Sequence, residues 1–199
     1  MKNYSLETEK EILSLNGKKP RLLLHSCCGP CSAYVLEYLS SHFEITVLFY
    51  NPNIQPESEY ELRLHNQMLL LKEFPQVRIL TCDYITDEFN AAIEGLEKEP
   101  EGGIRCRACI ELRLRETAKT AKKMDFEYFC STLSVSPQKN ANMINEIGER
   151  LSEEYKIKWL YSDFKKKDGY KKSIELSKKL GIYRQDYCGC LHSIRKAEE

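Results

Sequence analysis

The sequence gathers most of its cysteines into three short groups. Seven of the nine belong to them, namely Cys27, Cys28 and Cys31 in H-S-C-C-G-P-C, Cys106 and Cys109 in C-R-A-C, and Cys188 and Cys190 in Y-C-G-C. Cysteines one to three residues apart can present both sulfurs to one metal centre or to each other. Three such groups in one chain predict a shared site, whereas Cys82 and Cys130 stand alone.

Each spacing has its own chemistry. The adjacent Cys27 and Cys28 can supply two metal contacts, and Pro30 behind them begins an expected helix whose positive end favours thiolates. The alternative for this pair is two buried thiols that act as small hydrophobic groups. The C-x-x-C spacing of the second group occurs in zinc sites, iron-sulfur sites and dithiol redox pairs. The C-G-C group suits either a strained, readily reduced disulfide or a second pair of metal ligands.

Four thiolates can hold a zinc ion or an iron-sulfur cluster. A structural zinc site commonly uses two C-x-x-C pairs, but here one pair is adjacent and lies at the end of the expected sheet where ligands bind, which favours a catalytic cluster. Asp83 follows Cys82 at the end of an expected strand and is a candidate metal ligand or acid. It could equally cap the segment that follows.

Composition is that of a soluble globular protein. The 199 residues are 42% hydrophobic and 30% charged, which predicts a folded chain of one domain, residues 1–199. No apolar run is long enough to span a bilayer and no signal peptide is recognisable, so we expect a cytoplasmic protein. In that reducing compartment, clustered cysteines indicate metal binding or redox chemistry.

The order of elements predicts an α/β fold. Strands are expected at residues 21–25, 44–50, 77–81, 127–130 and 159–161. Helices are expected at residues 5–15, 30–40, 56–74, 87–96, 107–123 and 138–154, with one more after the charged loop 165–171. This alternation predicts a mainly parallel sheet with helices on both faces. Ligands of such sheets bind beyond the carboxyl ends of the strands, which is where the first cysteine group falls.

Two further segments have the composition of a binding surface. Residues 131–140, S-T-L-S-V-S-P-Q-K-N, lie between a strand and a helix, so they either hold a phosphate or ribose or form a loop with a helix cap. The formal net charge is zero, but seven lysines lie between residues 165 and 179. With Tyr170, Tyr183 and Arg184 nearby, this C-terminal segment suits RNA, although a solvated helix face is the usual role of such lysines.

Five motifs occur in a fixed order along the chain. They are H-S-C-C-G-P-C-S, Y-N-P-N-I-Q-P-x-x-E-Y-x-x-R, C-R-A-C-I-x-L-R-L, S-T-L-S-V-S-P-Q-K-N and Y-R-Q-D-Y-C-G-C. Together they resemble the epoxyqueuosine reductases of the QueH family, and the resemblance runs from His25 to Cys190. It implies an adenine-nucleotide-hydrolase-like three-layer α/β fold. The cysteines stand where ATP-using relatives of that fold have a phosphate loop, so we expect no use of ATP.

The resemblance also implies a reaction and a site. The reaction is the last step of queuosine synthesis, a two-electron reduction of the epoxide of epoxyqueuosine at the tRNA wobble position, with an electron donor that the sequence does not identify. The implied ligands of a [4Fe-4S] cluster are Cys27, Cys28, Cys106 and Cys109. Cys188 and Cys190 resemble a redox-active pair. An additional mononuclear iron is implied, for which the candidate ligands are Asp83 and cysteines that the cluster does not fully use.

Two other functions are compatible with the same residues. One is a zinc-stabilised RNA-binding module without redox chemistry, which metal analysis and visible absorption would distinguish from an iron-sulfur enzyme. The other is a thiol-disulfide reductase that uses Cys188 and Cys190 on a protein substrate. Cys31 is either a ligand of a second iron or a supporting thiol.

Overall fold

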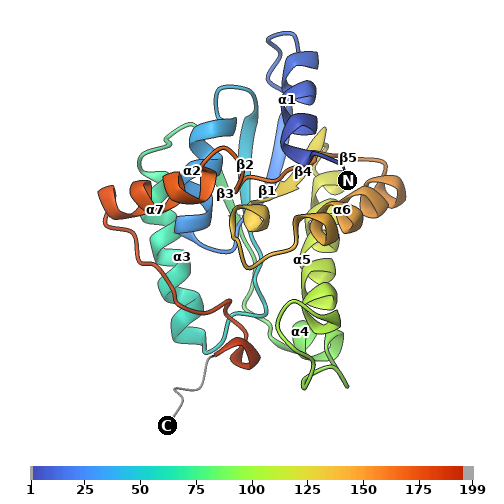
Figure 1. Ribbon diagram of the computed structural model, residues 1–199, viewed down its shortest axis with the longest axis vertical. Helices are drawn as coiled ribbons and strands as arrows, with labels where there is room; N and C mark the ends of the chain where they lie inside the picture. Colours follow the sequence, from blue (N-terminus) through green and yellow to red (C-terminus); the bar gives the residue numbers. More distant parts are fainter. Residues whose placement is uncertain (1, 195–199) are drawn as a thin grey trace.

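The predicted alternation of strands and helices is present in the computed structural model, which describes residues 2–194 (Figure 1). The strands are β1 (Arg21–His25), β2 (Glu44–Phe49), β3 (Arg78–Thr81), β4 (Tyr128–Ser131) and β5 (Lys158–Trp159). The helices are α1 (Tyr4–Ser14), α2 (Gly29–Leu39), α3 (Glu57–Leu71), α4 (Asp87–Ala92), α5 (Ile104–Lys123), α6 (Ala141–Tyr155) and α7 (Gly169–Lys179). Two short 3-10 helices are η1 (Thr132–Val135) and η2 (Leu191–Ser193).

Four helix boundaries differ from the predicted ones by three or four residues, namely the ends of α3 and α4 and the starts of α5 and α6, and two of them have a clear local reason. The structure ends α4 at Ala92 instead of residue 96, and the chain then turns through Gly95, whose φ of 76° favours glycine. The structure begins α6 at Ala141 instead of residue 138, because the Asn140 side chain caps the helix by accepting hydrogen bonds from the amides of Asn142 and Met143.

The five strands form one parallel sheet in the order β3-β2-β1-β4-β5. The central strand is β1, in which Leu24 lies between Val47 of β2 and Cys130 of β4. Parallel strands need crossover connections, and helices provide them here. The predicted α/β class and parallel sheet are therefore confirmed.

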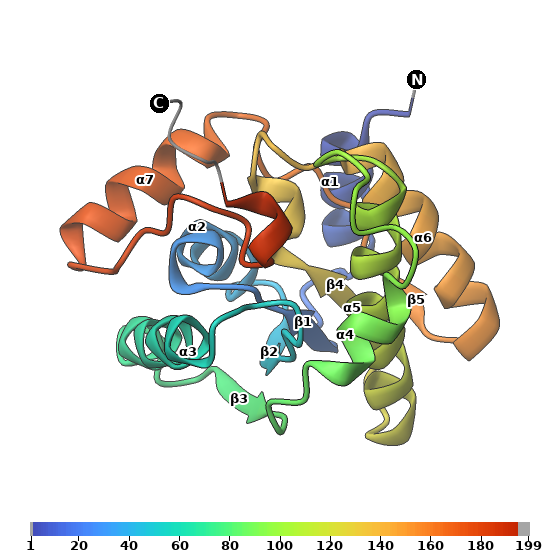
Figure 2. The ribbon, with the colours of Figure 1, turned by 90° about the horizontal axis from the view of Figure 1, so that it is seen from below.

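Helices cover both faces of the sheet. Figure 2 shows α2, α3 and α7 on one side and α5 and α6 on the other. Side chains alternate along β1 accordingly, because Leu22 and Leu24 pack in the core beneath α2 and Leu23 packs in the core beneath α5. All three leucines are fully buried. The sequence run R-L-L-L-H is apolar on both faces because both faces are covered.

The strand order places a ligand-binding position at one end of the sheet. Strands β2 and β3 lie on one side of β1, and strands β4 and β5 lie on the other side. The direction in which strands are added to the sheet therefore reverses between β1 and β4. Sheets of this kind bind ligands in the crevice outside the carboxyl ends of the strands at that reversal. Here the two segments that leave those ends are the first cysteine group and residues 132–140.

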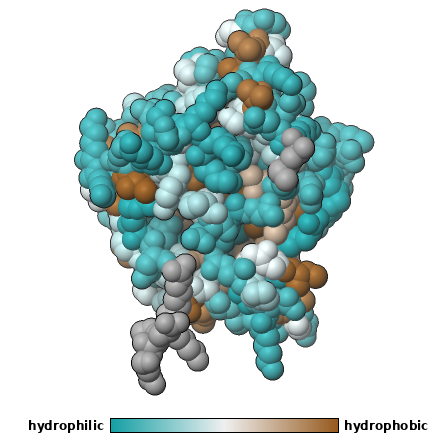
Figure 3. Space-filling view, in the orientation of Figure 1, coloured by the Kyte–Doolittle hydropathy of each residue, from teal (hydrophilic) through white to brown (hydrophobic). Residues whose placement is uncertain are grey.

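The surface is polar over the face shown in Figure 3, where hydrophobic side chains are scattered among hydrophilic ones. Large exposed hydrophobic residues such as Leu13, Met68 and Ile104 lie on different helices or at their starts. Among residues 2–194, no helix combines the length and apolarity that crossing a lipid bilayer requires.

Candidate metal centre and active-site cavity

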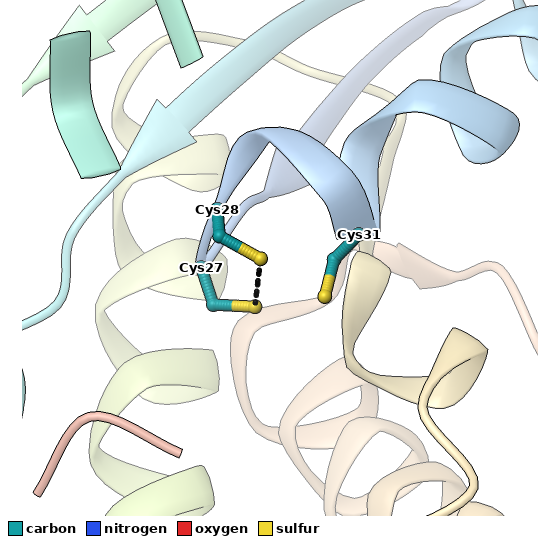
Figure 4. A group of neighbouring side chains, drawn as sticks. All are labelled: Cys27, Cys28 and Cys31. Carbon is teal, nitrogen blue, oxygen red and sulfur yellow. Dashed lines mark hydrogen bonds between the residues drawn. The ribbon is translucent and has the colours of Figure 1, made fainter. Parts of the chain in front are cut away.

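The first cysteine group occupies the turn between β1 and α2. Cys27 and Cys28 lie in the turn, and Cys31 lies in the first turn of the helix. Their three sulfurs lie within 4.8 Å of one another, and Figure 4 shows them converging on one point. The sulfurs of Cys27 and Cys28 are 3.7 Å apart and share a hydrogen bond. This group can hold a metal ion.

The electrostatics of this group favour one thiolate. Hydrogen bonds from the thiols of Cys28 and Cys31 hold the pKa of Cys27 well below its ordinary value, although burial acts in the opposite direction. Burial, together with the neighbouring Cys27, raises the pKa of Cys28 to about 12. The pKa of Cys31 is also raised, mainly by the hydrogen bonds with the other two thiols. A bound metal would take the place of the shared protons, since metal ligands must be deprotonated.

The second and third cysteine groups lie together. Cys106 and Cys109 are in the first turns of α5, and they line a small cavity with Cys188 and Cys190 from the C-terminal segment. Burial raises the pKa of the Cys109 thiol to about 11. The structure thus brings C-R-A-C and C-G-C together, as expected for a shared site.

A larger cavity is lined by cysteines of the first and third groups. It has a volume of about 310 Å³ and is lined by Cys27 and Cys31, by residues 135–139 at the end of η1 and after it, and by residues 184–188 of the C-terminal segment. Cys188 lines both cavities. All three cysteine groups therefore border two cavities that share lining residues, while the division of sulfurs between metals stays a prediction.

The C-terminal segment is held over the sheet by the loop after β2 and by α3. Arg63 has a side chain that is only 1% exposed, and it donates hydrogen bonds to the carbonyls of Tyr187 (3.2 Å) and Cys188 (3.1 Å). The Tyr187 hydroxyl donates to the carbonyl of Gln55 at 2.6 Å. The backbone N–H of Gln55 donates to the carbonyl of Gly189 at 2.9 Å. These contacts position the C-G-C group.

Three polar side chains contact the thiols or lie among them. The Lys139 ammonium lies 2.9 Å from the sulfur of Cys188, and the Gln185 amide donates to the sulfur of Cys28 at 2.9 Å. Arg113 lines both cavities. Sequence reasoning identified Lys139 within the segment 131–140, but it missed Arg113, Gln185 and the anchoring role of Arg63.

A signal for Arg113 was present, because it lies four residues after Cys109 and so on the same face of α5. The roles of Gln185 and Arg63 depend on contacts across more than 120 residues of chain, which no local pattern displays.

The remaining sequence candidates lie outside the two cavities or inside the core. Asp83 is exposed and follows the edge strand β3, which β2 separates from β1, so its role as a metal ligand stays a prediction. Cys82 is partly buried beside it. The thiol of Cys130 is fully buried and donates to the carbonyl of Leu160 at 3.3 Å, as an ordinary core cysteine does.

His25 is a satisfied core histidine. It is fully buried, and burial lowers its pKa to about 4, so the imidazole is neutral at physiological pH. Its Nε2 faces the carbonyl of Tyr50 at 3.2 Å and its Nδ1 faces the hydroxyl of Ser131 at 2.9 Å. Because a carbonyl can only accept, Nε2 carries the proton and Nδ1 accepts from Ser131. His25 therefore ties β1 to β4 directly beneath the cysteine turn.

Comparison with known proteins identifies the family. The family model described as epoxyqueuosine reductase QueH matches residues 22–196. A protein of Streptococcus pyogenes with that name is 44% identical over 89% of this chain and 71% of its own length. Namesakes from Staphylococcus epidermidis and Staphylococcus aureus are 41% and 39% identical, over 98% and 96% of this chain and 88% and 85% of their own lengths. The chain, with its cysteine groups at the carboxyl edge of a parallel sheet, belongs to the epoxyqueuosine reductase QueH family.

Proposed function

We propose that this chain is an iron-sulfur oxidoreductase that reduces the epoxide of epoxyqueuosine, at the wobble position of a tRNA, to the alkene of queuosine. The family supports the reaction, since its named relatives are epoxyqueuosine reductases. The observation that carries it is the group of three converging thiols beside a cavity at the strand-order reversal. The epoxide takes up two electrons and two protons and gives the alkene and water.

The donor set fits a thiolate-bound cofactor. Three sulfurs lie within 4.8 Å of one another, and four more cysteines line the adjoining small cavity. Soft thiolates of this kind bind iron-sulfur clusters and zinc. A two-electron reduction requires a redox-active centre, which zinc is not. When bound, an iron-sulfur cluster supplies electrons one at a time.

We assign ligands as the family resemblance implies. The proposed ligands of a [4Fe-4S] cluster are Cys27, Cys28, Cys106 and Cys109. Cys188 and Cys190 are the proposed redox-active pair, and Asp83 is the proposed carboxylate ligand of a second iron. Because Asp83 is exposed in this structure, its assignment needs a direct measurement of iron content.

The cavity suits a single nucleobase. A volume of about 310 Å³ is at the small end of ligand pockets, so it admits one modified base and excludes a stacked duplex. A wobble base lies in a single-stranded loop and can leave its stack at little cost. Tyr170 and Arg184 line the cavity and are exposed, so they stand at its rim, where a ring can stack on a base and a guanidinium can bind a phosphate. Lys139 holds a positive charge beside Cys188.

The proposal is tested by anaerobic reconstitution with iron and sulfide, followed by incubation with tRNA that carries epoxyqueuosine and with dithionite as reductant. Mass spectrometry of the digested nucleosides should show conversion to queuosine. Cys27→Ser and Cys106→Ser should lose the visible cluster absorption and the conversion together. Cys130→Ser is the matched control, because its thiol lies in the core, and it should retain both.

Three results would count against this assignment. Iron-loaded protein that binds the tRNA and converts no epoxyqueuosine contradicts the proposed reaction. Bound zinc with no iron-sulfur absorption after reconstitution supports the zinc-stabilised module. Reduction of a protein disulfide that depends only on Cys188 and Cys190 supports the thiol-disulfide reductase. Separately, an iron content that is the same in Asp83→Ala and wild type rules out Asp83 as a ligand.

A further inference from the structure

Arg113 is a buried cation that lies among the cysteine groups. Its residue is 1% exposed, and it lines the large and the small cavity. The hydrogen bond that the structure gives its guanidinium runs from Nε to the carbonyl of Cys109, at 3.2 Å. Among residues 2–194, none of the ion pairs includes Arg113.

The other two buried arginines are satisfied differently. Arg63 pairs with the carboxylate of Glu59 at 2.6 Å. Arg105 donates to the carbonyls of loop residues Glu97 and Glu99 and of His192. Arg113 has neither a carboxylate nor a set of carbonyls, and a buried charge without compensation is unfavourable.

The groups left to compensate Arg113 are sulfurs. Arg113 lines the small cavity with Cys109 and Cys188, and it lines the larger cavity with Cys188 and Cys27. These three cysteines come from the second, third and first groups, so Arg113 lies where all three groups meet. An anionic metal-thiolate centre supplies the counter-charge that a set of neutral thiols lacks.

We propose that Arg113 is the fixed counter-cation of the cysteine site and sets the reduction potential of the metal centre that the cysteines hold. This inference rests on the proposed function, because it requires a redox-active centre. Reduction adds one negative charge to the centre, and a fixed positive charge beside it stabilises the reduced state. Net charge near a cluster is one of the factors that set its potential. Arg113 thereby makes the centre easier to reduce, as a positioning residue that need not touch the substrate.

The test measures potential in addition to turnover. Reconstituted wild type, Arg113→Met and Arg113→Lys are titrated anaerobically with dithionite in the presence of mediators, and reduction is followed by visible absorption and electron paramagnetic resonance. Arg113→Met should shift the midpoint to more negative potential, whereas Arg113→Lys, which keeps the charge, should stay close to wild type. Arg107→Met is the matched control on the same helix, because this side chain is 46% exposed, and it should leave the midpoint unchanged.

The outcomes separate this inference from the proposed function. A wild-type midpoint in Arg113→Met, or an equal shift in Arg113→Met and Arg113→Lys, overturns the role of the charge. If Arg113→Met does not fold by circular dichroism, Arg113→Gln is the second neutral variant, since its amide can still donate to the Cys109 carbonyl. The neutral variants could fold and yet fail to load iron while Arg113→Lys loads it. That result supports the role of Arg113 as the counter-cation. A wild-type protein that forms no cluster contradicts the proposed function instead.

Discussion

Arg63 provides the sharpest test of how the C-G-C group is positioned. Replacing it with methionine removes its hydrogen bonds to the carbonyls of Tyr187 and Cys188 and leaves Glu59, whose side chain is 12% exposed, without its cation. Breaking a buried ion pair by removing one partner costs about 3–5 kcal/mol. We therefore expect Arg63→Met to destabilise the docked C-terminal segment by about that amount. Arg107→Met removes only an exposed pair with Glu146, which is worth about 0–1 kcal/mol.

Two assays report where this cost appears. Urea unfolding followed by fluorescence of the single tryptophan, Trp159, reports global stability, because this residue is buried on β5, at the far edge of the sheet. Amide exchange at Gln55 reports the segment itself, since its N–H donates to the Gly189 carbonyl at 2.9 Å. If the segment undocks locally, a loss of about 3 kcal/mol raises the open population roughly 100-fold.

A double variant tests how much of the loss comes from the Arg63–Glu59 ion pair. In the double variant Arg63→Met/Glu59→Gln no unpaired carboxylate remains, so roughly 1–3 kcal/mol of the loss should be regained. Should Arg63→Met match Arg107→Met both in urea and in exchange at Gln55, the anchoring role is wrong. If only the regain is missing, the carbonyl hydrogen bonds carry the effect and the ion pair does not.

Three further substitutions test neighbouring contacts. Gly189→Ala should undock the C-terminal segment at a cost of about 1–3 kcal/mol, because the φ of this residue is 123° and a new Cβ would lie 2.9 Å from an isoleucine side chain. Unchanged amide exchange at Gln55 would contradict this prediction. Gly148→Ala would place a Cβ 2.2 Å from the ring of Trp159, so urea unfolding should show a loss of about 1–3 kcal/mol, and wild-type stability refutes the packing. Lys139→Met should slow alkylation of Cys188 by the anionic reagent iodoacetate several-fold in metal-free protein, since the ammonium lies 2.9 Å from the sulfur and attracts the reagent, and Lys139→Arg should restore the rate.

The fold was predictable from local patterns because its core elements carry clear signals. The run R-L-L-L-H, followed by a turn and by Pro30 near a helix start, specifies a buried strand and then a helix, and the structure has both. The same pattern placed the first cysteine group at the carboxyl end of a strand. Boundaries were less predictable where a single side chain decides them, as Asn140 does at the start of α6.

The arrangement of the cysteine groups was only partly predictable. Spacing within a group is local, and it correctly indicated that Cys27, Cys28 and Cys31 present their sulfurs together. Which groups lie side by side depends on contacts that are distant in sequence. The Arg63 contact with the Cys188 carbonyl spans 125 residues, and it decides where the C-terminal segment lies. No periodicity in the sequence encodes such a contact.

The polar members of the family motifs acquire a physical role from the structure. Four motifs each contribute one polar side chain to the cysteine site, namely Arg63, Arg113, Lys139 and Gln185. Three of the four are cations with little exposure to solvent. Only Arg63 has a carboxylate at short distance, at 2.6 Å, whereas Lys139 lies closer to a sulfur (2.9 Å) than to Glu101 (3.4 Å).

The chain has zero net charge, but these cations are concentrated beside the cysteines, and the two kinds of group stabilise each other when the sulfurs are ionised. Buried cations are unfavourable next to neutral thiols and favourable next to thiolates, so each cation lowers the cost of keeping the sulfurs deprotonated. In the proposed iron-sulfur centre, the same charges would favour binding of a group whose thiolate ligands make it anionic overall, and they would favour its reduced state over its oxidised state. Stabilisation of a reduced state is irrelevant to a zinc site, because zinc has no redox chemistry. The distinction can be measured as the dependence of the reduction potential on the charge of Arg113.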